Sequence, residues 1–429
     1  MNRPGTERFR LGPVVVAGML LWPSAVTALD TAWELGVSQE HSDNIQRNPE
    51  GQEVADVVRT GSLGAQLQAD RSYLEGEAEV RVDYLHYREG TFSDEIRGQG
   101  SADLIWHISP ERFSWQLQER LAVVEERSTE PLSPANRQQV NVLSTGPDYR
   151  LRLGGNRFLE AGARYTDLRY SQSDTDSQRV GVQLQLGYRP SPVLENRLIL
   201  DMTRTHFPLR ASTRDYDRQD LYGRVTLRGA TTRTIADLGV TGIQRAAGDD
   251  IAGGLARLAW ERDLTAVTQL RVNLAGEYSN TASDLLGRPE EPVRDPAAVE
   301  SSADVFFARR GDIGIRHETP RGSLALDLLV EDREYEEAPL DQLRTQASLI
   351  LGVVAGPRSR LELFGYHASY DYDATERRDV DREGGLRLRY RLRRSLEVRL
   401  EGARAERVTN GDTGEYQENR ALLELSYRG

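Results

Sequence analysis

Apolar and polar residues alternate with a period of two along most of this chain. Between residues 73 and 87, one face carries mainly aliphatic side chains, while the other face is charged. The same alternation recurs in residues 179–189, 270–278, 324–330 and 386–392. Successive side chains of a β-strand point to opposite faces of the sheet. The pattern therefore predicts many strands of one sheet with an apolar surface and a polar surface.

The segments between these strands fall into two length classes. Tight connections rich in Gly, Pro, Asn and Ser are predicted near residues 70–72, 110–112, 154–156, 190–192, 356–357 and 393–395. Longer polar connections are predicted at residues 48–55, 128–139, 285–300 and 377–383. Bacterial outer-membrane barrels have short periplasmic turns and longer extracellular loops. We therefore expect an all-β fold, a single closed antiparallel transmembrane β-barrel of about 20 strands (roughly 18–22).

Soluble all-β folds fit the pattern less well. Strands of a β-sandwich usually span about five or six residues, whereas several strands here exceed the length of about nine to eleven residues that crosses a bilayer on a tilt. A propeller or solenoid would show a fixed sequence repeat, and the chain shows only recurring alternation. Aromatic residues near strand ends, such as Trp33, Trp115 and Tyr188, are typical of the interfacial girdles of membrane barrels.

The N-terminus predicts export. Arg3, Arg8 and Arg10 precede the mostly apolar stretch 11–22, and small residues at 26 and 28 suit cleavage after Ala28. An uncleaved membrane anchor is the alternative, but this stretch is shorter than the roughly 20 residues that a spanning helix needs. We expect a signal peptide at residues 1–28 and a barrel at residues 29–429, located in the outer membrane of a Gram-negative cell.

Composition excludes several functions. The chain contains no Cys, so disulfides and thiolate metal sites are ruled out. Its formal net charge is −12, which argues against nucleic acid as a partner because such proteins need a basic surface. Every basic residue apart from His is an Arg. The planar guanidinium group suits anionic sugars and lipid phosphates, although biased codon usage explains the absence of Lys equally well.

No catalytic motif is recognisable, and we expect neither enzymatic activity nor a cofactor. His41, Ser42 and Asp43 are adjacent, so neighbouring side chains point to opposite faces of a strand and cannot form a triad. An acidic group at residues 371, 373, 379 and 381 could bind a divalent cation. A solvated acidic loop is the better interpretation, and we expect no metal site.

The lumen is where a function is expected, since about 20 strands enclose more space than their side chains fill. The alternation assigns a set of mostly charged side chains to the inner face: Glu75, Glu77, Glu79, Arg81, Asp83, Gln183, Gln185, Arg271, Arg387, Arg389, Arg391 and Arg399. They would either set a field across the pore or serve as cross-strand ion pairs. The long connection at 285–300 is the best candidate for a constriction loop, with an exposed loop as the alternative; its candidate residues are Leu285, Leu286, Arg288, Glu290 and Arg294.

Short motifs resemble those of one family. The first strand and its loop read Ser38-Gln39-Glu40-His41-Ser42-Asp43-Asn44-Ile45 and then Asn48-Pro49-Glu50-Gly51, and residues 136–140 and 144–147 add to the likeness. In pattern and motifs the chain resembles the outer-membrane β-barrel porin 2 group, which is associated with exosortase and exopolysaccharide gene systems. The resemblance implies an outer-membrane location and a link to polysaccharide or surface-protein export.

Two functional hypotheses follow. The first is a porin-like channel, serving either general diffusion or export of exopolysaccharide or surface proteins. The alternative is a non-conducting structural barrel that scaffolds a periplasmic or surface partner. Expected partners are outer-membrane lipid, lipopolysaccharide and components of the polysaccharide or exosortase system. The alternating Leu423, Leu425 and Tyr427 near the C-terminus would bind the barrel assembly machinery.

Overall fold

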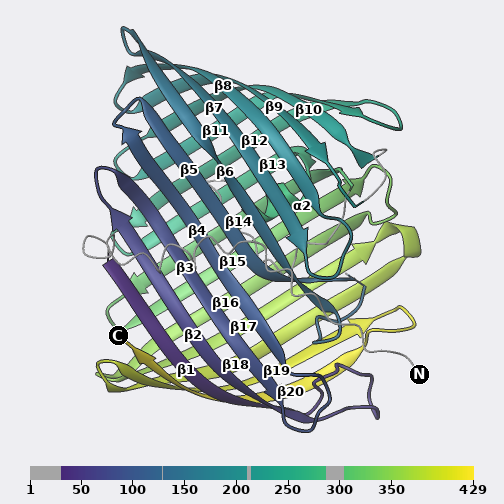
Figure 1. Ribbon diagram of the computed structural model, residues 1–429. Coiled ribbons are helices and arrows are strands. Elements are labelled where there is room, and N and C mark those ends of the chain that lie inside the picture. Colours follow the sequence, from purple (N-terminus) through teal and green to yellow (C-terminus); the bar gives the residue numbers. More distant parts are fainter. Residues whose placement is uncertain (1–29, 128, 210–213, 287–303) are drawn as a thin grey trace.

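The computed structural model describes residues 30–127, 129–209, 214–286 and 304–429, which form one closed antiparallel β-barrel (Figure 1). Its 20 strands each pair with their neighbours in sequence, and β1 pairs with β20 to close the ring. This confirms the expected fold class and strand number. The predicted signal peptide, residues 1–28, lies outside the described residues.

The strands are 12 to 18 residues long. Their bounds are β1 Asp30–Ser42, β2 Asp56–Asp70, β3 Leu74–Tyr87, β4 Glu95–Ser109, β5 Phe113–Glu125, β6 Arg137–Gly154, β7 Arg157–Tyr170, β8 Ser177–Ser191, β9 Leu194–His206, β10 Tyr216–Arg228, β11 Thr232–Arg245, β12 Ile251–Thr265, β13 Thr268–Ser279, β14 Phe306–Thr319, β15 Gly322–Tyr335, β16 Gln342–Gly356, β17 Ser359–Tyr372, β18 Arg377–Arg393, β19 Leu396–Thr409 and β20 Tyr416–Arg428. A short helix, α2 (Thr281–Leu286), follows β13, and a 3₁₀ turn, η4 (Asp373–Thr375), follows β17.

Connection length separates the two ends of the barrel. Every connection from an even-numbered strand to the next strand has two or three residues, whereas every connection from an odd-numbered strand has four or more. We call these ends the turn end and the loop end. One of the shortest is the β6–β7 connection, in which Gly155 and Asn156 adopt φ of 56° and 65°, the left-handed conformation of a type I′ hairpin turn.

One predicted loop is wrong. Residues 377–383 were expected to form a long connection, but they are the first part of β18. Both faces of the strand are polar here, because Arg378 and Arg382 occupy the outer face of a strand whose inner face carries Asp379 and Asp381. A segment that is polar on both faces looks like a loop in the sequence.

The helix α2 identifies the inner face of the barrel. Its Ala282 and Leu285 share a hydrophobic cluster with Ala122 and Val124 of β5, while its Asp284 forms an ion pair with Arg333 of β15. Strands β5 and β15 stand ten places apart in a ring of 20, so only the interior can bring both to one helix. Residues paired across neighbouring strands share a face, and the pairings carry this assignment around the whole ring.

The opposite, outer face is apolar. On β8, Val182, Leu184 and Leu186 are 42%, 39% and 50% exposed, whereas the intervening Gln183 and Gln185 point inward and form hydrogen bonds. Exposed aliphatic side chains recur in this way on strand after strand around the barrel. Among the described residues, no helix has the length and apolar character needed to cross a bilayer.

The difference between the two faces can be measured by substitution. Because the outer face is expected to meet lipid, Leu184→Arg should destabilise the folded barrel by about 2–4 kcal/mol near the bilayer midplane. Gln183→Arg is the matched control on the inner face, where Asp201 lies 3.0 Å from the Gln183 amide and can accept from the new guanidinium group. The free energy of unfolding, measured by urea titration in lipid vesicles, should separate the two variants. Equal destabilisation would contradict the assigned register.

Candidate functional site

The inner wall is a network of ion pairs. Arg387 of β18 contacts Glu401 of β19 at 2.7 Å and Glu362 of β17 at 3.3 Å. Further round the ring, Arg399 of β19 lies 3.2 Å from Glu424 of β20. Each strand in this part of the wall is thus linked to the next by side chains as well as by its backbone.

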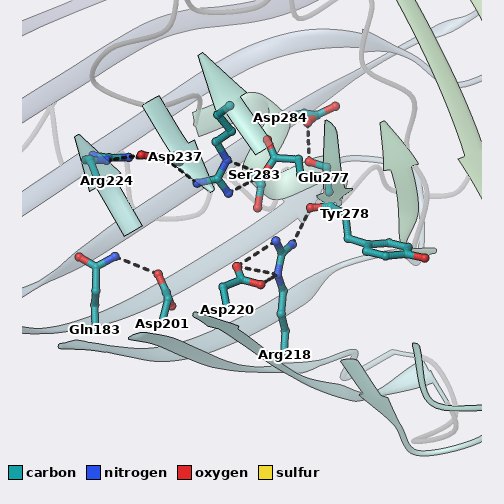
Figure 2. A network of polar contacts seen from close by, with 12 residues as sticks. Gln183, Asp201, Arg218, Asp220, Arg224, Asp237, Glu277, Tyr278, Ser283 and Asp284 are labelled. Carbon is teal, nitrogen blue, oxygen red and sulfur yellow. Dashed lines mark hydrogen bonds and ion pairs between the residues drawn. The ribbon is translucent and has the colours of Figure 1, made fainter. Parts of the chain in front are cut away.

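A second network of polar contacts lies on the inner face of another part of the ring, strands β8 to β13. Figure 2 shows charged and amide groups from neighbouring strands pointing toward one another in pairs. Arg224 of β10 and Asp237 of β11 form a two-pronged contact at 2.8 and 2.9 Å. Arg218 of β10 binds Asp220 on its own strand and donates to the backbone oxygen of Tyr278 on β13 at 2.8 Å. These contacts hold long polar side chains along the wall.

Aromatic rings also position the arginines. Phe158 lies between the guanidinium groups of Arg150 and Arg197, with its ring centre 5.0 and 5.2 Å from them. Tyr222 lies within 6 Å of the guanidinium groups of Arg224 and Arg257 in the same manner. Cation–π contacts of this length are attractive, and they keep these arginines close to the wall.

The inner face of β3 is open at the turn end. Glu75, near the start of β3, is 65% exposed at its side chain and lies 3.4 Å from His107. Glu77 and Glu79 follow on the same inner face and are also exposed. Five strands away round the ring, Arg391 of β18 is exposed as well. Charged side chains with this much exposure inside a barrel require water around them.

The loop end is filled instead. Strand β5 remains paired with β6 up to Glu125, but its pairing with β4 stops at Leu121. Beyond this point the β5–β6 hairpin leaves the wall. Arg137 on one side of the hairpin forms an ion pair with Glu95 of β4 and donates to the Tyr87 hydroxyl of β3, both of which belong to the inner face. The tip of the hairpin therefore lies inside the barrel.

The connection at the tip of this hairpin reaches the far wall. The Arg377 guanidinium of β18 donates to the carbonyl oxygen of Thr129 at 2.6 Å and to that of Thr413 at 3.0 Å. Strand β18 is seven places from β5 by the shorter way round the ring. The hairpin thus spans the lumen near the loop end.

Helix α2 completes this filling. Leu285 and Ala282 are each 3% exposed and pack on Val124, Val140 and Val142, which are 0 to 1% exposed. On the other side, Arg333 of β15 forms ion pairs with Asp284 of α2 at 3.5 Å and with Glu331 at 3.0 Å. We call α2 and the hairpin tip, residues 122–142, the plug.

Other connections at the loop end are tied together too. Asp304 accepts hydrogen bonds from the backbone nitrogens of Glu337 and Ala338, both at 2.8 Å. The Glu337 carboxylate in turn contacts Arg214 and Arg245 from the β9–β10 connection and β11. Outside the strands, Asp94 accepts hydrogen bonds from Tyr84 and His86, and these bonds lower the pKa of its carboxyl group.

The inner-face residues named from the sequence do lie on the inner face by register: Glu75, Glu77, Glu79, Arg81, Asp83, Gln183, Gln185, Arg271, Arg387, Arg389, Arg391 and Arg399. Their role in a pore stays a prediction. Of the constriction candidates, Leu285 is buried in the plug and Leu286 packs beside it. Arg288, Glu290 and Arg294 lie outside the described residues.

The inward course of the β5–β6 hairpin was not predicted from the sequence. Its signal was present in residues 121–124, which are all apolar (Leu-Ala-Val-Val) and so break the alternation. In the structure, Ala122 and Val124 are buried against α2, while Leu121 and Val123 on the other face are partly exposed. Within the described part of the chain, no group of three or more His, Asp or Glu side chains is arranged to hold a metal ion, and the acidic residues near 371–381 are no exception.

Comparison of the sequence with protein-family models and with curated proteins finds no match. Solved structures do align with the fold. A mutant of the ferric enterobactin receptor PfeA from Pseudomonas aeruginosa, in complex with enterobactin, is 10% identical with a TM-score of 0.47 over 93% of this chain and 81% of the other. OccK2 of the same organism, in complex with glucuronate, is 11% identical with a TM-score of 0.41 over 94% and 98%. These are similarities of one large β-barrel to another.

The buried ion pair of the plug provides a stability test. Removing one partner of a buried pair leaves an uncompensated charge, so Arg333→Met should lower the free energy of unfolding by about 3–5 kcal/mol. Arg309→Met is the control, because Arg309 on the neighbouring strand pairs with Asp332 and Glu334 at exposed positions, where a pair contributes about 0–1 kcal/mol. Urea titration of both variants measures the difference. A similar, small effect of both substitutions would mean that Arg333 is not buried against the plug.

Proposed function

We propose that this protein is an outer-membrane channel for hydrophilic solutes whose extracellular mouth is narrowed by the plug. The observation that carries the proposal is the gradient of exposure along the inner face. Carboxylates of β3 at the turn end, such as Glu75, stand in open space, while inner-face groups at the loop end, such as Arg407 and Glu418, are 4% and 3% exposed. The lumen is therefore a watery funnel that closes toward the loops.

The orientation follows from the connections. Outer-membrane barrels place short turns in the periplasm and longer loops outside the cell. The wide opening then faces the periplasm and the plug faces the exterior. An apolar outer surface, a ring without free edges and a predicted signal peptide all support insertion into the outer membrane.

The resemblance to the exopolysaccharide-associated porin group suggests a more specific role in export of polysaccharide or surface proteins. Inner-face arginines, among them Arg389, Arg391 and Arg399, could bind carboxylates of such chains through their planar groups. A barrel that only scaffolds a partner, without conducting, is the competing function. Conductance decides between a channel and a scaffold.

Trimming the plug should open the pore. Ala122 and Val140 are directly paired, so residues 123–139 can be replaced by Asn-Gly, which forms a two-residue hairpin turn. We expect small or intermittent conductance for the natural protein in planar bilayers and severalfold larger conductance for the trimmed one. The control is the same replacement of residues 244–250, between the paired Ile243 and Ile251, outside the plug. Closed bilayers for all three proteins would favour the scaffold.

Ion selectivity tests whether the carboxylates of β3 line the path of the ions. Neutralising Glu75, Glu77 and Glu79 to Gln together should shift the reversal potential toward anions, since fixed charges at a pore wall attract ions of the opposite sign. The matched control neutralises Asp332, Glu334 and Glu406, which lie on the outer face, to Asn or Gln. An equal shift for both triple variants would show that the β3 carboxylates do not line the ion path.

A further inference from the structure

A groove of about 550 Å³ lies on the outer face of the barrel, where β17 to β20 meet β1. Its walls are leucines from four strands: Leu361, Leu386, Leu388, Leu400 and Leu423. Most of them are roughly half exposed, between 42% and 53% where the value is given. The groove is thus open to whatever surrounds the barrel and is lined by aliphatic surface.

Small residues on adjacent strands create this groove. Gly402 of β19 and its partner Ala421 of β20 both line the groove. A Cβ atom added to Gly402 would meet nothing within 4 Å, and this residue does not need a positive φ. The backbone therefore does not require glycine at this position. The missing side chains leave space on an outer face that is otherwise covered by large aliphatic groups.

The edge of the groove toward the loop end is polar and basic. Arg404 lies on the same outer face as Gly402, two residues closer to the loop end. Its exposed guanidinium group donates to the Gln417 side chain at 2.8 Å. His41 of β1 is paired with Ala421 and lines the groove. Arg59 of β2 is paired with Gln39, another lining residue, and is exposed. A chain with a net charge of −12 thus presents cations at this edge.

We infer that this groove binds the lipid A part of lipopolysaccharide, with an acyl chain against the leucines and a phosphate at Arg404. Apolar walls with a basic edge complement a lipid that has saturated chains and anionic phosphates. The basic edge lies toward the loop end, which is the level of the outer leaflet if the loops are extracellular. The inference rests in this respect on the proposed membrane orientation.

The test measures retention of lipid A by the full-length protein refolded in detergent. Purified hexa-acylated, bis-phosphorylated lipid A is titrated in, and bound lipid is counted by native mass spectrometry. We expect Gly402→Leu, which fills the groove, and Arg404→Gln, which removes the cation, each to weaken binding by roughly tenfold. The control is Gly254→Leu on the outer face of β12, where an added Cβ also meets nothing within 4 Å.

Three results would overturn the inference. The first is that Gly402→Leu binds lipid A as tightly as the natural protein. The second is that the Gly254→Leu control weakens lipid A binding as much as Gly402→Leu does, and the third is that the natural protein binds phosphatidylglycerol, which carries one phosphate and two chains, as tightly as lipid A. A heat-shift assay on denaturing gels checks that each variant is folded. A folded protein that conducts but binds no lipid A would contradict this inference alone, whereas failure to insert into bilayers would contradict the proposed function.

Discussion

Residues 34–42 of β1 pair with residues 420–428 of β20, and this contact leaves the 20-stranded sheet without a free edge. In lipid, each unpaired backbone N–H or C=O group would raise the free energy of the folded state by roughly several kcal/mol. A β-sheet can therefore span a bilayer only if it is closed. Closure also divides every strand into an inner and an outer side. The aliphatic residues then have to face outward and the ionised ones inward, where they pair across strands as Arg387 does with Glu401.

A ring of this size cannot be filled by its wall alone, which explains the plug. The inner face at the turn end is left to water around Glu75. At the loop end, the β5–β6 hairpin leaves its place beside β4 and buries Val124, Val140 and Val142 against α2. Burial of these apolar side chains favours the inward position by the hydrophobic effect. The buried Arg333–Asp284 pair adds a fixed contact between the plug and the opposite wall.

The sequence predicted those features that depend on the direction of side chains. Alternation identified the inner and outer faces of strands such as β3 and β8, and connection length identified the two ends. It could not show what lies against a face, so the inward course of the β5–β6 hairpin was missed despite the unbroken apolar run at residues 121–124. It also failed where both faces are solvated, as at residues 377–383, because a polar strand end and a polar loop have the same composition.

The plug's course across the lumen is the central claim, and cross-linking tests it most directly. The chain has no Cys, so the double substitution Thr129→Cys/Thr413→Cys introduces one pair in a clean background. Both backbone oxygens accept hydrogen bonds from the same Arg377 nitrogen. Oxidation or a short bifunctional maleimide should therefore join the two introduced thiols in the membrane-inserted protein, seen as a shift in gel mobility. Two comparison variants combine Thr129→Cys with Gly90→Cys or Asp174→Cys, which lie in the connections on either side of the hairpin. If the thiol at position 129 cross-links to these cysteines and not to the one at position 413, the plug does not cross the lumen.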